Sequence, residues 1–118
     1  MLFDLDGNQM TRVPHKDQFD NWRTIIEDAD YDRAVDAIKD RIAPVNIFTS
    51  SFLPGRDWTG TPFQPLYVAC GKSVKQSGYF FGLIVWSIIM EDDDKWVFKP
   101  SEKDDGDPLG TTYWRRHG

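Results

Sequence analysis

The chain has 118 residues, a usual length for one domain, and no linker-like stretch divides it, so we predict a single domain over residues 1–118. Its formal net charge of −5 leaves no sign of the basic face that binds phosphates, and we expect no nucleic-acid partner. Its longest apolar run falls short of the roughly 20 residues of a membrane helix, so we expect no membrane partner. One cysteine, and an acidic N-terminal segment unlike a signal peptide, favour a cytoplasmic location.

The N-terminal half predicts a short hairpin, or a strand with a turn, followed by two helices. Residues 2–6 alternate apolar and acidic side chains, and Gly7 and Asn8 suit the turn of a hairpin. Apolar side chains then recur every three or four residues in two segments, which predicts two amphipathic helices, one from about His15 and one ending at Pro44. The two apolar stripes are Phe19, Trp22, Ile25 and Ile26, and Tyr31, Ala34, Val35, Ile38 and Ile42.

The C-terminal half predicts most of a sheet, because it is rich in β-branched and aromatic residues. We expect strands over 45–52, 79–90, 95–99 and 111–115, the third as the return strand of a hairpin with the second. The predicted fold class is α+β: two N-terminal amphipathic helices packed on a mainly antiparallel, curved sheet of four to five strands.

The connections between these strands are also predicted. Residues 53–62 contain glycines and prolines that favour a loop, and residues 63–69 favour a short helix that Gly71 ends. The polar, acidic segment 101–108 is typical of disorder.

Segment 79–90 carries apolar side chains at both odd and even positions. In a strand, these side chains would cover both faces, whereas a sheet with one face in water should alternate. Since two helices cover one face, we expect a second copy of the chain to cover the other, and we predict a homo-oligomer. The predicted interface residues are Tyr79, Phe81, Leu83, Val85 and Trp86.

Segment 49–67 is the predicted binding surface, because it places hydroxyl, charged and aromatic side chains in a loop after a strand. Arg56, Asp57 and Trp58 combine a fork-shaped donor, an acceptor and a stacking face, which suits a small polar or aromatic ligand. In the alternative interpretation, Trp58 packs over the sheet edge and Arg56 pairs with a nearby acid. The predicted ligand-binding residues are Thr49, Ser51, Arg56, Asp57, Trp58 and Tyr67.

The first segment, LFDLDGN, resembles the first motif of haloacid-dehalogenase-like phosphatases, in which a strand delivers two aspartates beside a magnesium ion. The resemblance implies a magnesium-dependent phosphatase or hydrolase, with Asp4 as nucleophile and Asp6 as acid or base. Asn8 stands where that family usually has Thr or Val. The alternative that the residues themselves favour is an acidic β-turn.

Three further features suggest chemistry less strongly. The segment Cys70-Gly71-Lys72-Ser73 matches the end of a phosphate-binding loop, but Leu66 stands where that loop needs glycine, which favours a helix C-terminus. The acidic segments 91–94 and 102–107 are typical of solvated turns, and Cys70 of a buried thiol. We therefore predict no catalytic residue, no metal and no cofactor.

Taken together, the residues predict a noncatalytic domain that binds a small molecule or a protein through segment 49–67 and self-associates through its sheet. The small magnesium-dependent phosphatase or hydrolase is the first alternative. A structural or regulatory oligomer without a ligand is the second.

Overall fold

The structure is a computed structural model, and it describes residues 1–49, 61–99 and 111–116. Within these ranges it contains four helices and a five-stranded mixed sheet that is mostly antiparallel, which confirms the predicted α+β class. None of the described helices is both long and apolar enough to cross a membrane. The predictions for residues 53–60 and 101–108 lie outside the described residues.

The N-terminal half folds as its sequence pattern predicts. Strands β1 (Leu2–Phe3) and β2 (Gln9–Met10) form an antiparallel hairpin, whose turn uses the positive φ of 87° at Gly7. Helix α1 (Lys16–Ile25) and helix α2 (Asp28–Ile42) follow, and each turns most of its apolar stripe toward the core, although Ile25 is 57% exposed.

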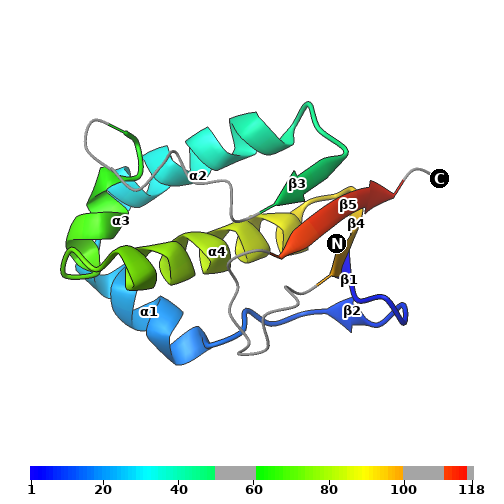
Figure 1. Ribbon diagram of the computed structural model, residues 1–118, viewed down its shortest axis with the longest axis horizontal. Helices are drawn as coiled ribbons and strands as arrows, with labels where there is room; N and C mark the ends of the chain where they lie inside the picture. Colours follow the sequence, from blue (N-terminus) through cyan, green and yellow to red (C-terminus); the bar gives the residue numbers. More distant parts are fainter. Residues whose placement is uncertain (50–60, 100–110, 117–118) are drawn as a thin grey trace.

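Segment 79–90 lies within helix α4 (Val74–Glu91), so the prediction of a strand there is wrong. The helix begins at Ser73, whose hydroxyl oxygen accepts a hydrogen bond from the backbone N–H of Gln76 at 3.2 Å. Figure 1 shows α4 between α2 and α1, with α3 (Gln64–Ala69) beside its N-terminal end. A helix that is apolar all round is a buried helix, and here tertiary packing overrides the β-propensity of its residues.

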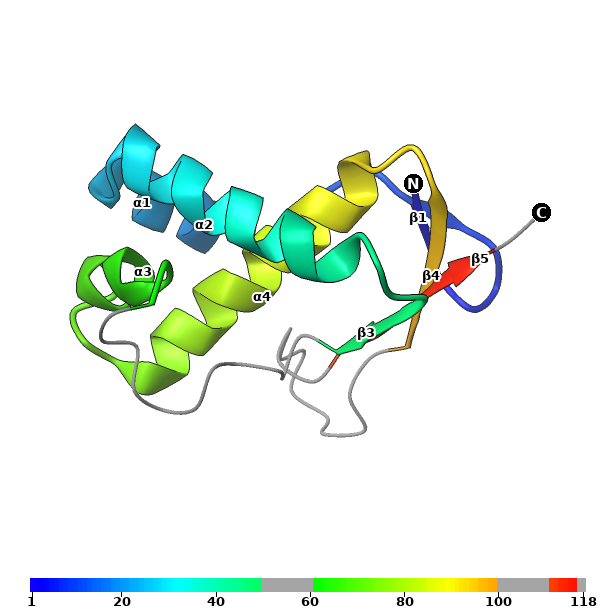
Figure 2. The same cartoon turned by 90° about the horizontal axis from the view of Figure 1, so that it is seen from above.

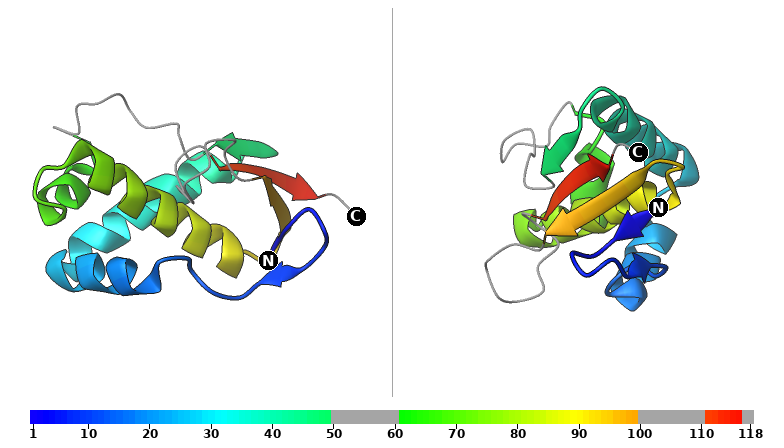
Figure 3. Two further views of the ribbon diagram at one scale, coloured as in Figure 1. Left: turned by 60° about the horizontal axis from the view of Figure 1, so that its bottom comes forward. Right: turned by 90° about the vertical axis from the view of Figure 1, so that its right-hand side faces the viewer.

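The sheet has the strand order β2-β1-β4-β5-β3. Strand β4 (Lys95–Lys99) pairs in parallel with β1 and antiparallel with β5 (Thr112–Arg116), which also pairs with β3 (Ile47–Thr49). Figure 3 shows β4 between its two neighbours. Because the preceding segment is helical, the hairpin predicted between 79–90 and 95–99 does not form.

Helix α4 and the sheet meet at one end of the molecule. Figure 2 shows the strands gathered at the end toward which α4 runs. Trp96 of β4 and Tyr113 of β5 are both fully buried there, and the ring of Tyr113 lies 6.5 Å from that of Trp86. The core is therefore continuous from the helices to the sheet.

Replacing Ile84 of α4 by alanine tests the central position of this helix. Ile84 is fully buried, so Ile84→Ala should lower the free energy of unfolding by about 2–5 kcal/mol through lost contacts and a residual cavity. Urea unfolding followed by tryptophan fluorescence measures the change. Ile25→Ala removes the same atoms from a side chain that is 57% exposed and should change it by less than about 0.5 kcal/mol. Equal losses in the two variants would contradict the burial of α4.

Candidate functional site

A groove with a volume of about 560 Å³ runs between α2 and the C-terminal part of α4. Its apolar lining comes from Val35 and Ile42 of α2 and from Ile88 of α4. The acidic residues 91–94, which end α4 and lead into β4, form one end together with Arg115 of β5. The groove thus joins an apolar floor to a charged end.

The periodicity of α2 and the burial of α4 explain why the groove forms here. Tyr31, Val35 and Lys39 follow one another at four-residue intervals and so line the same side of α2. On α4, residues 80–86 are buried, whereas Ser87 and Ile88 are only partly buried. The groove therefore lies beside the partly buried side of α4 near its C-terminus, while Ile89 stays in the core.

Arg115 closes the groove by joining three parts of the fold. Its Nη1 donates to Oδ2 of Asp94 at 2.8 Å, and its Nη2 donates to the backbone carbonyl of Ile42 at 3.0 Å. Its guanidinium carbon lies 4.6 Å from the centre of the Trp96 ring. The side chain is only 17% exposed, so these contacts fix α2, the turn after α4 and the sheet relative to one another.

The acidic end contains two kinds of carboxylate. Asp92 and Asp94 serve the fold, because Asp92 accepts hydrogen bonds from Trp96 Nε1 at 2.9 Å and from the Asp94 N–H at 3.2 Å, and Asp94 pairs with Arg115. Glu91 and Asp93 are exposed, and their side chains have no hydrogen-bond or ion-pair partner among the described residues. Two carboxylates at this end are therefore open to solvent.

Tyr31 of α2 and Glu91 of α4 both line the groove, and the negative charge of Glu91 acts on the hydroxyl group of Tyr31. Burial raises the pKa of Tyr31, the nearby Arg23 lowers it, and the negative charges of Glu91 and Asp32 raise it. The guanidinium carbon of Arg23 lies 4.1 Å from the centre of the Tyr31 ring. The charge of Glu91 is thus felt on the α2 side of the groove.

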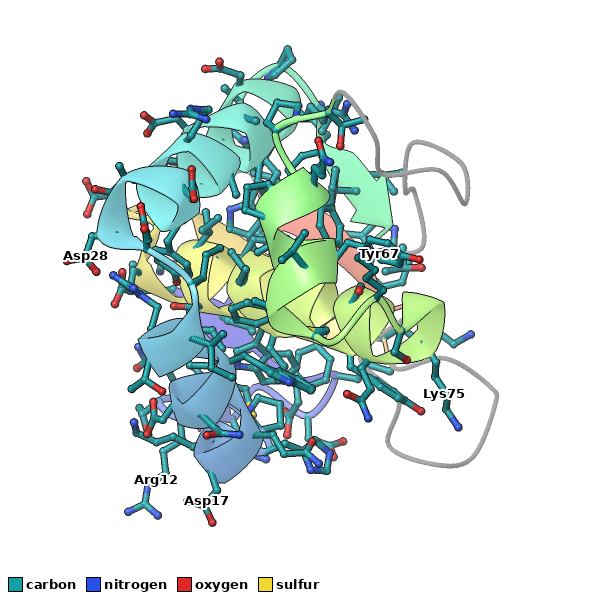
Figure 4. The ribbon with its side chains drawn as sticks, turned by 90° about the vertical axis from the view of Figure 1, so that its left-hand side faces the viewer. Arg12, Asp17, Asp28, Tyr67 and Lys75 are labelled. Atoms are coloured by element: carbon teal, nitrogen blue, oxygen red, sulfur yellow. The ribbon has the colours of Figure 1, made fainter. Side chains whose placement is uncertain are left out.

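The predicted binding segment 49–67 is only partly described. Thr49 pairs with Thr112 through the backbone of β3, and Tyr67 lies on α3, where Figure 4 labels it. Ser51, Arg56, Asp57 and Trp58 lie outside the described residues. The binding role of this segment stays a prediction, and the groove is a second candidate site, which the sequence did not predict.

The residues predicted to form an interface lie in helix α4 and not in a two-faced strand. Phe81, Leu83 and Val85 are at most 1% exposed and Trp86 is 8% exposed, because they pack in the core of their own chain, and Tyr79 is partly buried. No strand presents these side chains on two faces, so they do not require a second subunit. Self-association stays a prediction that light scattering can measure.

The segment that resembles the phosphatase motif forms the turn of the first hairpin. The carboxylate of Asp4 accepts hydrogen bonds from the N–H of Asn8 at 2.8 Å, from the Asn8 side-chain amide at 3.1 Å and from the N–H of Asp6 at 3.0 Å. The bonds from Asn8 are the main reason why the pKa of Asp4 is lowered. This geometry matches the acidic β-turn. Among the described residues, no group of three or more His, Cys, Asp or Glu side chains could hold a metal.

The segment resembling a phosphate-binding loop forms the predicted helix C-terminus. Gly71 and Lys72 have positive φ angles of 65° and 62°, and the Lys72 N–H donates to the Tyr67 carbonyl at 2.8 Å. Cys70 is 5% exposed, and burial raises its pKa to about 11, while a hydrogen bond with Ser77 lowers it. The thiol is therefore protonated near neutral pH.

Arg115→Met tests whether this arginine holds the end of the groove together. The substitution leaves the Ile42 carbonyl and Asp94 without their donor, so the free energy of unfolding should fall by about 1–3 kcal/mol. Arg116→Met alters an exposed arginine of the same strand and should cost less than about 0.5 kcal/mol. Urea unfolding of both variants gives the comparison, and a smaller loss for Arg115→Met than for Arg116→Met would refute this bracing role.

The Cys70 thiol should react slowly in the folded protein. A pKa of about 11 in place of 9.0 leaves about a hundredfold less thiolate at about pH 8, so labelling by a disulfide reagent should be slower by at least that factor. The rate in urea is the reference, and Cys70→Ala gives the background. Similar rates in the folded and unfolded protein would show that the thiol is accessible.

Comparison of the chain with protein-family models, with curated protein sequences and with solved structures finds no match.

Proposed function

We propose that this protein is a noncatalytic domain that binds a small amphipathic molecule in the groove between α2 and α4. The observation that carries the proposal is the groove itself. Its volume of about 560 Å³ lies within the range of roughly 300–1,000 Å³ for small-molecule sites, and it combines apolar walls with a charged end. The apolar part of a ligand would contact Val35 and Ile88, and its polar part would lie near residues 91–94.

The environments of the candidate nucleophiles support a noncatalytic role. Cys70 is buried, and its raised pKa disfavours the reactive thiolate. The carboxylate oxygens of Asp4 accept hydrogen bonds within their own turn, which argues for a structural role rather than attack on a phosphate ester. Neither residue lines the groove.

Chemical-shift titration of isotope-labelled protein tests the proposal. The probes are phenylbutylammonium, phenylbutanol and phenylbutanoate, which have similar apolar bodies and different head groups. At least one probe should shift the amide signals of Val35, Ser87 and Ile88, since these residues line the groove. Ser87→Trp fills the groove with an indole ring and should weaken that binding at least about tenfold.

A second variant controls for the added ring. Gln18→Trp places the same side chain at an exposed position of α1 outside the groove and should leave the affinity unchanged. The spectra also report whether each variant is folded. The proposal fails if none of the probes binds, or if the Ser87→Trp protein, folded normally, binds them as the unmodified protein does. Shifts confined to Tyr67 and its neighbours would instead favour segment 49–67.

A further inference from the structure

We infer that the ligand of the groove is a cation, an ammonium or guanidinium group attached to an apolar body. This inference rests on the proposed function, because it assigns a chemical class to the ligand of the same groove. The charged residues that line the groove favour such a ligand. Four acidic side chains, residues 91–94, face two basic ones, Lys39 and Arg115.

The pairing within this set leaves negative charge available. Arg115 is committed to Asp94 and to the Ile42 carbonyl, and Asp92 accepts from Trp96. Glu91 and Asp93 also line the groove, and their carboxylates pair with no other side chain among the described residues. On the opposite wall, Lys39 is exposed and can turn its ammonium group into solvent. A cationic ligand would therefore meet two carboxylates whose oxygens are free to accept.

Two helix ends add to this negative potential. Helix α2 ends at Ile42 and α4 ends at Glu91, and both C-terminal ends lie at the charged end of the groove. The last carbonyl groups of a helix carry a partial negative charge, which favours a cation within the last turn. Glu91 adds a full negative charge to such an end.

The chain already places cations of its own at this end. The guanidinium of Arg115 donates to the carbonyl of Ile42, at the C-terminus of α2. The α-amino group of Met1 donates to the carbonyls of Ile89 at 3.4 Å, of Asp94 at 2.9 Å and of Asp92, beside the C-terminus of α4. Each uses a carbonyl acceptor from the last turn of a helix or from the acidic turn. A ligand's ammonium group would find a different and charged kind of oxygen acceptor at this end, the side-chain carboxylates of Glu91 and Asp93.

The apolar floor of the groove indicates that the ligand also has an apolar part. Val35, Ile42 and Ile88 line the groove beside its charged end, so one molecule can contact both. A small inorganic cation would leave this apolar surface in water, and an uncharged hydrocarbon would leave the carboxylates without a partner. A cationic amphiphile satisfies both parts of the site.

The three phenylbutyl probes measure this preference directly. Phenylbutylammonium should bind about tenfold more tightly than phenylbutanoate, with phenylbutanol between them, and added salt should reduce the difference. Glu91→Gln combined with Asp93→Asn removes both free charges while keeping side-chain size, and it should reduce the preference to about twofold or less. Chemical-shift titration gives the three affinities for each protein.

The matched control is Asp6→Asn combined with Asp40→Asn. It makes the same change in net charge at two exposed positions outside the groove, and it should keep the preference. If the probes bind in the groove with equal affinity, or phenylbutanoate binds best, the charge assignment is wrong while the groove proposal stands. If none of the three binds, both fail. An equal loss of preference in the control would also overturn the assignment, because it would reflect net charge alone.

Discussion

The burial of α4 is the constraint on which the rest of the structure depends. Its aromatic side chains meet a different neighbour on each side: the Phe80 ring lies 5.4 Å from that of Trp22 on α1, and the Phe81 ring lies 5.2 Å from that of Phe63 before α3. Near its C-terminal end, the Trp86 ring lies 4.7 Å from that of Phe98 on β4. A helix that is apolar all round needs such cover on every side, and a single chain of this size supplies it.

The groove follows from the point at which this cover ends. Residues 80–86 of α4 are buried, whereas Ser87 and Ile88 are partly buried and line the groove together with residues of α2. Arg115 bridges the gap between the two helix ends and the sheet. Its contacts keep the charged end of the groove in place, so the packing that stabilises the fold also positions the candidate site.

Local pattern was enough to predict the hairpin, the first two helices and the last two strands, because each has a clear period or turn signal. It failed at 79–90, where a buried strand and a buried helix both give continuous apolar sequence. Two signals favoured the helix: the run is longer than a typical strand, and Ser73 stands at a good N-cap position. The groove cannot be predicted from an interpretation of 79–90 as a strand, because one of its walls is the C-terminal part of helix α4.

The acidic segment 91–94 shows how a structural and a binding role can share one turn. Trp96 and Arg115 need acceptors at this end, and Asp92 and Asp94 supply them. No described hydrogen bond or ion pair uses the side chain of Glu91 or Asp93, although adjacent like charges at a helix C-terminus lower stability. Stability therefore accounts for two of the four carboxylates. The proposed cationic ligand of the groove would account for the other two, because its charge would offset theirs.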